Sequence, residues 1–423
     1  MLYMACQNDQ FRTHWRRCLT DMDLWEDVKL QFPALHDDRV VYLDSAATTQ
    51  MPEVVLKAVS DYERAGRGNP HRGLHDFAAR ATELLQASRA AVAQFIGAQP
   101  AELLFTKGTT EGLNLVTQAL GSQLGPGDEV VLTIFEHHAM LLPWRQLALE
   151  RGFTIKYLPM SEVGTVDLEL AKRIITSKTR VVAVIHASNV LGTILPVAEI
   201  VELAHSVGAW VILDAAQSVA RLPIDVRTLG CDAMAFGAHK MYGPEGIGAL
   251  YIADRLRPHL KPLLFGGGMV DEVLDDTIRY AEDVRLFEAG SPNVGGAAGF
   301  AAACTFLKSL GLERVREREL ALISRLVSGL DQLPRVKLHS AEPALGRVGV
   351  VSFSIEGVHS HDAAQILADQ GIAVRAGYHC AAPLTRCLDL SGTVRVSFGV
   401  YSLATDVDRL VTGIRNVLDR FPL

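Results

Sequence analysis

Polar side chains follow four hydrophobic, strand-like segments of this sequence of 423 residues. The four polar groups are Phe135-Glu136-His137-His138, His186-Ala187-Ser188-Asn189, Asp214-Ala215-Ala216-Gln217 and Gly237-Ala238-His239-Lys240. In an open parallel sheet, ligands bind at the carboxyl ends of the strands, where such groups meet. One of these groups alone could be an ordinary surface loop. The four together predict a binding site at that edge of the sheet.

A fifth motif could bind an anion. Thr106-Lys107-Gly108-Thr109-Thr110-Glu111-Gly112 directly precedes the helical run Leu113–Leu120. Free N–H groups and hydroxyls at the start of a helix bind phosphate. A plain helix cap is an equal alternative, because a Thr followed by Glu also serves that purpose. No G-x-G-x-x-G motif follows an early strand, so a dinucleotide cofactor has little support.

A phosphate site beside an Asp, a Lys and a His fits pyridoxal 5′-phosphate (PLP). The Lys240 amine would form a Schiff base with the aldehyde, for which its pKa must fall from the usual value of about 10.4. The Asp214 carboxylate would keep the pyridine nitrogen protonated, which maintains the ring as an electron sink. His137 could stack on the face of the ring.

The elements that would position these residues alternate between strands and helices from about residue 100 to 255. The predicted strands are Glu129–Ile134, Thr154–Leu158, Arg180–Ile185, Trp210–Leu213, Ala233–Phe236 and Ile247–Ile252. Amphipathic stretches such as Ala139–Arg151 and Val197–Val207 lie between them. This alternation predicts an α/β fold with a mostly parallel, doubly wound sheet.

A different pattern after about Gly290 predicts a smaller α+β domain. Its expected elements are helices at Gly311–Leu333, His361–Gln370 and Thr405–Phe421, and strands at Gly349–Ser354, Ile372–Arg375 and Thr393–Phe398. We expect a large domain at 36–290 and a small domain made of 1–35 and 291–423. The first 20 residues or so could be disordered.

Composition excludes several classes of function. The formal net charge of −7 gives no reason to expect nucleic acid as a partner. No apolar run of 18 residues occurs, so no membrane span is expected, and the N-terminus lacks the apolar block of a secretory signal. The cytoplasm is the expected location, with a short Arg-bearing targeting segment as the alternative.

The six cysteines do not form a disulfide or zinc pattern, since no C-x-x-C pair occurs among positions 6, 18, 231, 304, 380 and 387. Cys231, Cys304 and Cys387 are expected to be structural. His359 and His361 are expected to form a solvated helix cap, with a metal or a partner protein as the alternatives. No metal site is predicted.

At this point the sequence resembles the group II (SufS/CsdA-like) cysteine desulfurases, of the class V aminotransferase family of fold-type I PLP enzymes. The resemblance runs from about Phe32 to the end of the chain. It rests on Tyr42-Leu43-Asp44-Ser45-Ala46-Ala47-Thr48, Asn69-Pro70-His71-Arg72-Gly73, Gly108-Thr109-Thr110-Glu111, Glu136-His137-His138, Ser188-Asn189-Val190, Asp214-Ala215-Ala216-Gln217, His239-Lys240-Met241-Tyr242-Gly243-Pro244, Phe287-Glu288-Ala289-Gly290-Ser291-Pro292-Asn293, Arg375-Ala376-Gly377-Tyr378-His379-Cys380 and Arg395-Val396-Ser397-Phe398.

The resemblance implies an aspartate aminotransferase-like fold with a sheet of the seven-stranded type. It implies a role in cofactor binding for eight residues. They are Lys240 as the Schiff-base lysine, Asp214 at the pyridinium nitrogen, Gln217 facing the ring hydroxyl, His137 stacked on the ring and assisting proton transfer, Thr110 and His239 at the phosphate, Thr109 mainly through its backbone, and Ser291 from the partner subunit of a homodimer, with the turn Gly266–Met269 beside it.

The resemblance also implies that Cys380 takes sulfur from L-cysteine as a persulfide and that alanine is released. Asn189, Arg395 and Arg375 would bind the substrate, with Arg395 holding its carboxylate. His379 and Arg375 are candidates for stabilising the Cys380 thiolate. The sulfur would pass to a small carrier protein, for iron–sulfur clusters or another thio-cofactor. Selenocysteine lyase activity, another PLP reaction and a non-enzymatic scaffold are the alternatives.

Two positions depart from the family pattern. Gly237 stands where the family usually has a Ser that contacts the phosphate, so weaker PLP binding is expected unless water or a backbone N–H replaces that contact. Tyr378 stands where relatives often have His.

Overall fold

A central sheet crosses the middle of the computed structural model, which describes residues 21–71, 73–339 and 346–422. In this part of the chain the sheet has seven strands in the order β2-β8-β7-β6-β5-β3-β4, and only β8 runs opposite to the others. The strands are β2 (Leu103–Thr106), β3 (Glu129–Thr133), β4 (Thr154–Leu158), β5 (Thr179–Ile185), β6 (Trp210–Asp214), β7 (Ala233–Gly237) and β8 (Gly248–Ile252). The predicted mostly parallel sheet is confirmed, although β2 was not among the strands predicted from the sequence.

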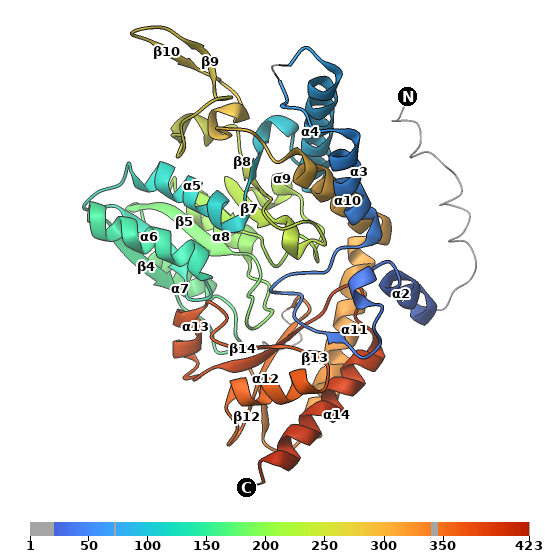
Figure 1. The fold of residues 1–423 in the computed structure, drawn as a ribbon. Helices are drawn as coiled ribbons and strands as arrows, with labels where there is room; N and C mark the ends of the chain where they lie inside the picture. Colours follow the sequence, from blue (N-terminus) through green and yellow to red (C-terminus); the bar gives the residue numbers. More distant parts are fainter. Residues whose placement is uncertain (1–20, 72, 340–345, 423) are drawn as a thin grey trace.

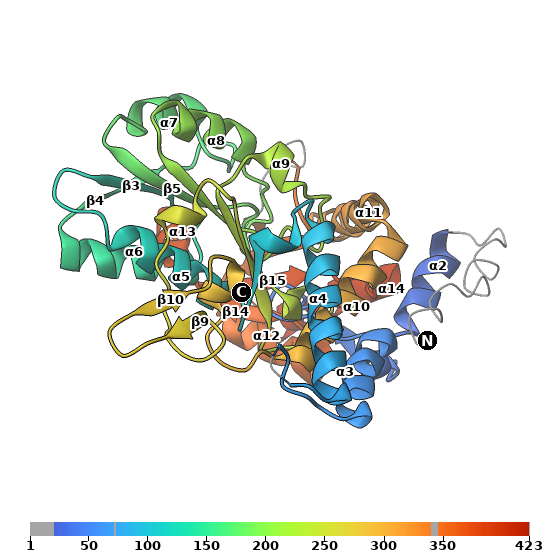
Figure 2. The same ribbon diagram turned by 90° about the horizontal axis from the view of Figure 1, so that it is seen from above.

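Helices cover both faces of this sheet (Figure 1; Figure 2). In the described residues up to Leu310, the helices are α2 (Asp21–Lys29), α3 (Glu53–Ala65), α4 (Asp76–Phe95), α5 (Thr109–Gly121), α6 (His138–Arg151), α7 (Leu168–Ile174), α8 (Val197–Ser206), α9 (Val226–Leu229) and α10 (Val294–Leu310). Successive side chains of a strand point to opposite faces. Val130 and Leu132 therefore pack in the core with α5 and α6, whereas Val131 packs in the core with α8.

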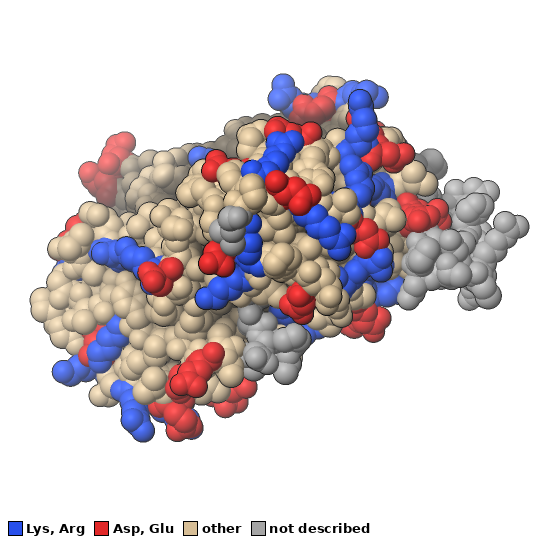
Figure 3. Space-filling model, turned by 90° about the horizontal axis from the view of Figure 1, so that it is seen from below, with Lys and Arg blue, Asp and Glu red and all other residues tan. Residues whose placement is uncertain are grey.

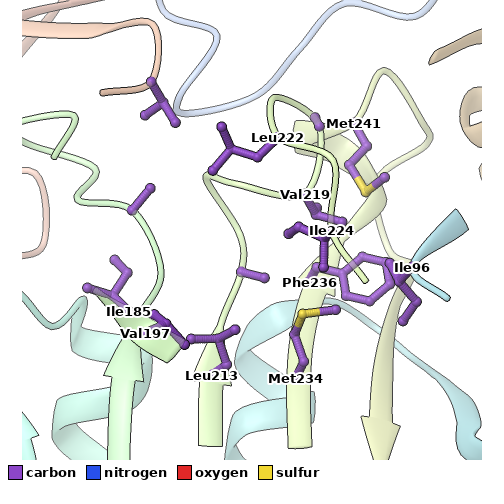
Figure 4. Packing of buried hydrophobic residues seen from close by; sticks show 14 of the residues in the cluster. Ile96, Ile185, Val197, Leu213, Val219, Leu222, Ile224, Met234, Phe236 and Met241 are labelled. Atoms are coloured by element: carbon purple, nitrogen blue, oxygen red, sulfur yellow. The ribbon is translucent and has the colours of Figure 1, made fainter. Parts of the chain in front are cut away.

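The larger core lies on the face of the sheet that packs with α8. Figure 4 shows Met234 and Phe236 of β7 in the layer that also contains Ile224. Because both faces of the parallel strands are buried, the strands are nearly continuous apolar runs. The polar residues that follow the strands are then left at one edge of a rigid layer.

The C-terminal part forms a second, smaller sheet, drawn in orange and red in Figure 1. Its strands are β11 (Val336–Leu338), β12 (Val350–Ile355), β15 (Thr393–Ser397) and β14 (Arg375–Gly377), in that spatial order and antiparallel. The helices are α11 (Leu312–Leu330), α12 (Ser360–Asp369), α13 (Ala382–Cys387) and α14 (Ala404–Arg420). Residues of α11, α12 and α14 share one apolar core with this sheet.

The prediction of one strand at Ile372–Arg375 was wrong. Ile372–Ala373 forms β13, which pairs with β1 (Val41–Tyr42), whereas Arg375 begins β14 and pairs with β15. A segment of four residues does not reveal that its two halves bond to different strands. The chain near residue 41 is thus tied to the C-terminal part, while α10 packs on α3 and α4. The predicted domain boundaries stay a prediction.

A hairpin of β9 (Val270–Val273) and β10 (Ile278–Tyr280) projects from the body of the molecule (Figure 1). Short 3₁₀ turns complete the described elements: η2 (Pro33–Leu35), η3 (Pro100–Glu102), η4 (Ala238–Lys240), η5 (Arg257–His259) and η6 (Val284–Phe287). Acidic and basic side chains are interspersed on the face in Figure 3. Among the described helices, none is by itself long and apolar enough to cross a membrane; α10 and α11 pass that test only as a pair bent by 74°.

Candidate active site

A cavity of about 960 Å³ lies where the strand ends of the large sheet meet the C-terminal part. Eleven of the predicted site residues line it: Thr109, Thr110, His137, Asn189, Asp214, Gln217, His239, Lys240, Arg375, Cys380 and Arg395. Ser291 is exposed and is not among the lining residues. The structure therefore brings together every predicted site residue except the one expected to act on a partner subunit.

Lys240 and Asp214 occupy the floor of the cavity. Burial lowers the pKa of the Lys240 amine to about 8; Asp214 opposes this shift, and Arg395 and Arg375 add to it. Asp214 is 2% exposed, and burial raises the pKa of its carboxyl, against a hydrogen bond from the Ala216 N–H to Oδ1 at 2.9 Å. The lowered pKa thus increases the share of the neutral amine that a reaction with an aldehyde needs, although the amine is still mostly protonated at pH 7.

His137 begins α6 as its N-cap. Its Nδ1 accepts a hydrogen bond from the Ala139 N–H at 3.1 Å. Burial lowers the pKa of the imidazole to about 3, and the charge of Lys240 adds to the shift. The ring is therefore neutral at ordinary pH and fixed in place, as a group that stacks on a cofactor ring should be.

The start of α5 provides an anion site. Gly108 precedes the helix with φ of 156°, and the Thr109 hydroxyl is buried without a hydrogen-bond partner. Such an orphaned hydroxyl beside free N–H groups is what a bound phosphate would satisfy. Thr110 is exposed at the same end. The expectation that Thr109 contributes mainly through its backbone leaves out this hydroxyl.

Gly237 lies against this anion site. A Cβ at Gly237 would lie 3.0 Å from ring atoms of His239 and 3.3 Å from the Thr109 hydroxyl. Burial lowers the pKa of His239 to about 4, so this ring is neutral. The space that a larger residue would need is therefore taken by the two side chains expected to hold the phosphate.

Two guanidinium groups also line the cavity. Arg395 is 2% exposed; its Nη2 donates to Asp44 Oδ1 at 3.0 Å and its Nη1 to the Asn189 carbonyl at 3.1 Å, while its Nε is buried without a partner. Arg375 is exposed. The two guanidinium groups suit a substrate carboxylate. Asp44, which sequence reasoning did not single out, orients Arg395.

In each of two amide side chains, one N–H group already donates a hydrogen bond within the protein. Gln217 Nε2 donates to the Ala46 carbonyl at 2.8 Å, and Asn189 Nδ2 donates to the His379 carbonyl at 2.6 Å. The buried Asn189 Oδ1 has no partner. One of the two Asn189 Nδ2 N–H groups is used by the His379 carbonyl, which leaves the second for a substrate carboxylate.

Cys380 is exposed on a strained loop between β14 and α13. His379 and Cys380 have φ values of 52° and 58°, in the left-handed region that costs a non-glycine residue about 1–3 kcal/mol. His379 Nε2 lies 2.8 Å from Thr393 Oγ1, and burial lowers the pKa of this ring to about 3. His379 is therefore a neutral residue bonded to β15, which argues against it as a cation for the Cys380 thiolate.

Other residues differ from their expected settings. Cys387, expected to be structural, is exposed and lines an apolar groove beside Arg145 and Arg386, because it lies on the outer side of the short helix α13. His361, expected in a solvated cap, does begin α12 beside the N-cap His359 but also lines the active-site cavity. The sequence signal that could have identified His361 is its position at the start of a predicted helix of the small domain. In the structure this helix faces Gly377. Tyr378 is exposed at the mouth of the cavity.

Cys231 and Cys304 are buried, as expected. In the described part of the chain, no group of three or more His, Cys, Asp or Glu side chains could hold a metal ion.

The cavity fits PLP at three points. The orphaned Thr109 hydroxyl at the start of α5 suits a phosphate, the buried Asp214 carboxylate suits a pyridinium, and the Lys240 amine with its lowered pKa suits an aldehyde. These three groups come from α5, the end of β6 and the turn η4, and they line one cavity.

Comparisons with known proteins agree with this arrangement. The aminotransferase class-V model matches residues 41–410. A probable cysteine desulfurase of Halalkalibacterium halodurans is 42% identical over 401 residues, covering 93% of this chain and 98% of its own length. The cysteine desulfurase of Haloferax volcanii is 41% identical over 388 residues, which is 90% of this chain and 91% of its own.

Solved structures show the same similarity. The apo cysteine desulfurase from Thermococcus onnurineus superposes with a TM-score of 0.90 at 39% identity, over 93% of this chain and 98% of its own. The Escherichia coli cysteine desulfurase CsdA, in an S-sulfonic acid form, gives a TM-score of 0.88 at 36% identity, over 94% and 99%. The chain belongs to the class-V aminotransferase family, as the resemblance in its sequence predicted.

Proposed function

We propose that this protein is a PLP-dependent cysteine desulfurase that converts L-cysteine to L-alanine and takes the sulfur onto Cys380. One observation carries the proposal: the exposed Cys380 and the Lys240 amine line the same cavity, opposite an anion site. Relatives named as cysteine desulfurases, about 40% identical over nearly the whole chain, support it.

Seven residues would hold the cofactor. They are Lys240 through its amine, Asp214 at the ring nitrogen, His137 on the ring face, Gln217 at the ring hydroxyl, and Thr109, Thr110 and His239 at the phosphate. When bound, PLP supplies an electron sink for a carbanion at the substrate Cα. The neutral Lys240 amine would remove the Cα proton, and the cation pair Arg395 and Arg375 would hold the carboxylate.

Cys380 would accept the sulfur. Its thiolate attacks the substrate sulfur, so that an S–S bond forms and the Cβ–S bond of the substrate breaks. The electron pair of that bond stays with the carbon fragment, which takes up protons and leaves as alanine. The product on the enzyme is a Cys380 persulfide, and no external oxidant or reductant is needed.

Exposed apolar side chains support a homodimer. Leu264, Phe265, Val273 and Ile278 are 53%, 67%, 64% and 50% exposed around the projecting β9–β10 hairpin. A second copy of the chain would cover this surface and bring its Ser291 and the Gly266–Met269 turn to the cofactor. Light scattering of the parent and of a Phe265→Asp variant tests the proposal: a parent that is monomeric contradicts it.

The sulfur would leave on a small acceptor protein, for iron–sulfur cluster or other thio-cofactor assembly, because the exposed Cys380 can be reached from solvent. Selenocysteine is a second candidate substrate, since the same cavity should accept it. The ratio of kcat/KM for the two amino acids decides between them. The cytoplasmic location stays a prediction that fractionation of the source cells would test.

The function is tested by incubating the holoenzyme with L-cysteine and measuring alanine, sulfide and the absorption of bound PLP. The Cys380→Ala variant should keep the PLP absorption and make no alanine. Cys387→Ala is the matched control, because Cys387 is also exposed, and it should behave as the parent. If the parent makes no alanine, or if Cys380→Ala makes as much as the parent, the proposal is wrong.

A further inference from the structure

We propose that His138 is a positioning residue: its imidazole clamps the loop that carries Cys380 against the start of α6. The ring Nε2 lies 3.4 Å from the Ala382 N–H, which donates to it, and the His138 N–H donates to the Cys380 carbonyl at 2.9 Å. One residue thus bonds to the loop on both sides of Ala381. The inference rests on the proposed function of Cys380.

The loop needs such a clamp because its backbone is strained. His379 and Cys380 both have positive φ values, and neither is a glycine. Two adjacent residues in this conformation persist only where the surroundings hold them. The Ala381 N–H donates to the Tyr378 carbonyl at 3.1 Å, but this bond lies within the loop. It cannot fix the position of the loop relative to Lys240 and Asp214 at the floor of the cavity, the cofactor floor.

Three groups from outside the loop hold it in the described structure. Asn189 after β5 binds the His379 carbonyl, and Thr393 of β15 binds the His379 ring. Both of these contacts hold His379, the residue that precedes Cys380 in the chain. His138 acts on Cys380 and on Ala382, so it holds the segment that enters α13. Without its ring, the hydrogen bond that α6 still makes to that segment is the backbone bond to Cys380, beside the packing of Ala381 and Leu384 in the core.

The environment of His138 suits an acceptor. Burial lowers the pKa of its imidazole, which favours the neutral ring that can accept an N–H. Its neighbour His137, with a ring centroid 6.3 Å away, faces the cofactor floor in the same cavity. The pair therefore places one imidazole at the cofactor and the next at the sulfur-accepting loop, and α6 sets the separation between them.

The clamp is expected to affect sulfur transfer and to leave cofactor binding unchanged. His138→Ala removes the ring acceptor and keeps the backbone N–H. We expect kcat for alanine formation to fall about 5- to 10-fold, which corresponds to the loss of one hydrogen bond that orients the nucleophile. KM for L-cysteine and the affinity for PLP should stay within about twofold of the parent.

The test compares the PLP-loaded parent with His138→Ala, His138→Asn and His138→Gln. Asn and Gln carry a carbonyl acceptor, so at least one should restore most of kcat. Gln146→Ala is the matched control, because Gln146 is exposed on α6 and bonds only within the helix, to Glu150 at 2.7 Å. It should leave both measurements unchanged.

Hydrogen–deuterium exchange of the peptide that contains Ala382 provides a readout that needs no turnover. His138→Ala should speed exchange there and leave peptides of β6 and β7 unchanged. Unchanged exchange, or equal falls in kcat and PLP affinity in all three His138 variants, would overturn the clamp. If exchange rises while the parent makes no alanine, the clamp stands and the proposed function fails.

Discussion

The cofactor floor and the Cys380 loop face each other across one cavity, yet they are built differently. The floor comprises Asp214, Gln217, His239 and Lys240, which lie at or just after the ends of β6 and β7, at the edge of a sheet buried on both faces. The loop carries two non-glycine residues with positive φ and depends on side chains from the segment after β5, from β15 and from α6.

This difference follows from what each half must do. PLP must be held in one orientation, so its ligands lie on rigid strand ends. In the proposed function, Cys380 reaches the substrate and then presents sulfur to an acceptor, which suits its place on an exposed segment. A strained segment of that kind can be held in the right place by a few bonds, and each of those bonds can be removed singly.

The largest effect is expected at the floor. Lys240→Ala should remove the stable PLP absorption and lower alanine formation by at least about 10²–10⁴-fold, because the variant loses both the amine that holds the cofactor and the group that moves the Cα proton. Cys380→Ala should lose activity but keep the PLP absorption. If Lys240→Ala retains both the PLP absorption and turnover, the division into two halves is wrong.

A smaller effect is expected in the loop. Thr393→Val removes the hydroxyl that bonds to His379 and leaves a buried imidazole without a partner, at a cost of about 1–3 kcal/mol in the free energy of unfolding. Turnover should fall roughly tenfold, with PLP affinity unchanged. Thr117→Val is the control in chemical denaturation and kinetics, since the Thr117 hydroxyl is buried with no partner to lose.

Gly237 tests how closely the floor is packed. Gly237→Ala should weaken PLP binding by about 1 kcal/mol, roughly fivefold in Kd, because its Cβ displaces the His239 ring. Titration of the apoprotein with PLP measures this. Gly125→Ala should have no effect, since nothing lies within 4 Å of the added carbon. Equal or tighter binding by Gly237→Ala would show that the ring moves freely.

The smallest effect concerns pH. The pKa of Lys240 is lowered to about 8, so the amine is mostly protonated below that pH and neutral above it. Capture of PLP by the apoprotein should therefore accelerate as the pH rises and level off above about 8. Arg375→Gln removes a cation that lowers this pKa and should move the inflection upward by less than about one pH unit. Rates that do not depend on pH would contradict the role of Lys240.

The sequence predicted the floor well because its residues follow strands that are recognisable as apolar runs. Asp214 ends β6 and Lys240 lies in the 3₁₀ turn that follows β7, and the sheet edge brings them together. The strand β2 was missed, since four residues carry little periodic signal. The same limit applies to the split between β13 and β14, which depends on pairing with distant strands.

The loop could be identified from its motif, but its geometry could not be predicted. His379 stands beside Cys380 in the sequence, yet its ring bonds to Thr393. Asn189 and His138 lie far from the loop in the sequence, and Asp44 lies far from Arg395. Their contacts arise only where the two sheets meet. Spacing within a motif does not determine which way a side chain points.

The most direct test of the role of Cys380 is to find which cysteine carries the sulfur taken from L-cysteine. The holoenzyme is treated with L-cysteine without acceptor or reductant, and its peptides are then analysed by mass spectrometry after alkylation. We predict one additional sulfur atom on the peptide that contains Cys380, in the parent and in Cys387→Ala, and none in Cys380→Ala. Sulfur found instead on Cys387, or alanine produced with no sulfur on either cysteine, would contradict this prediction.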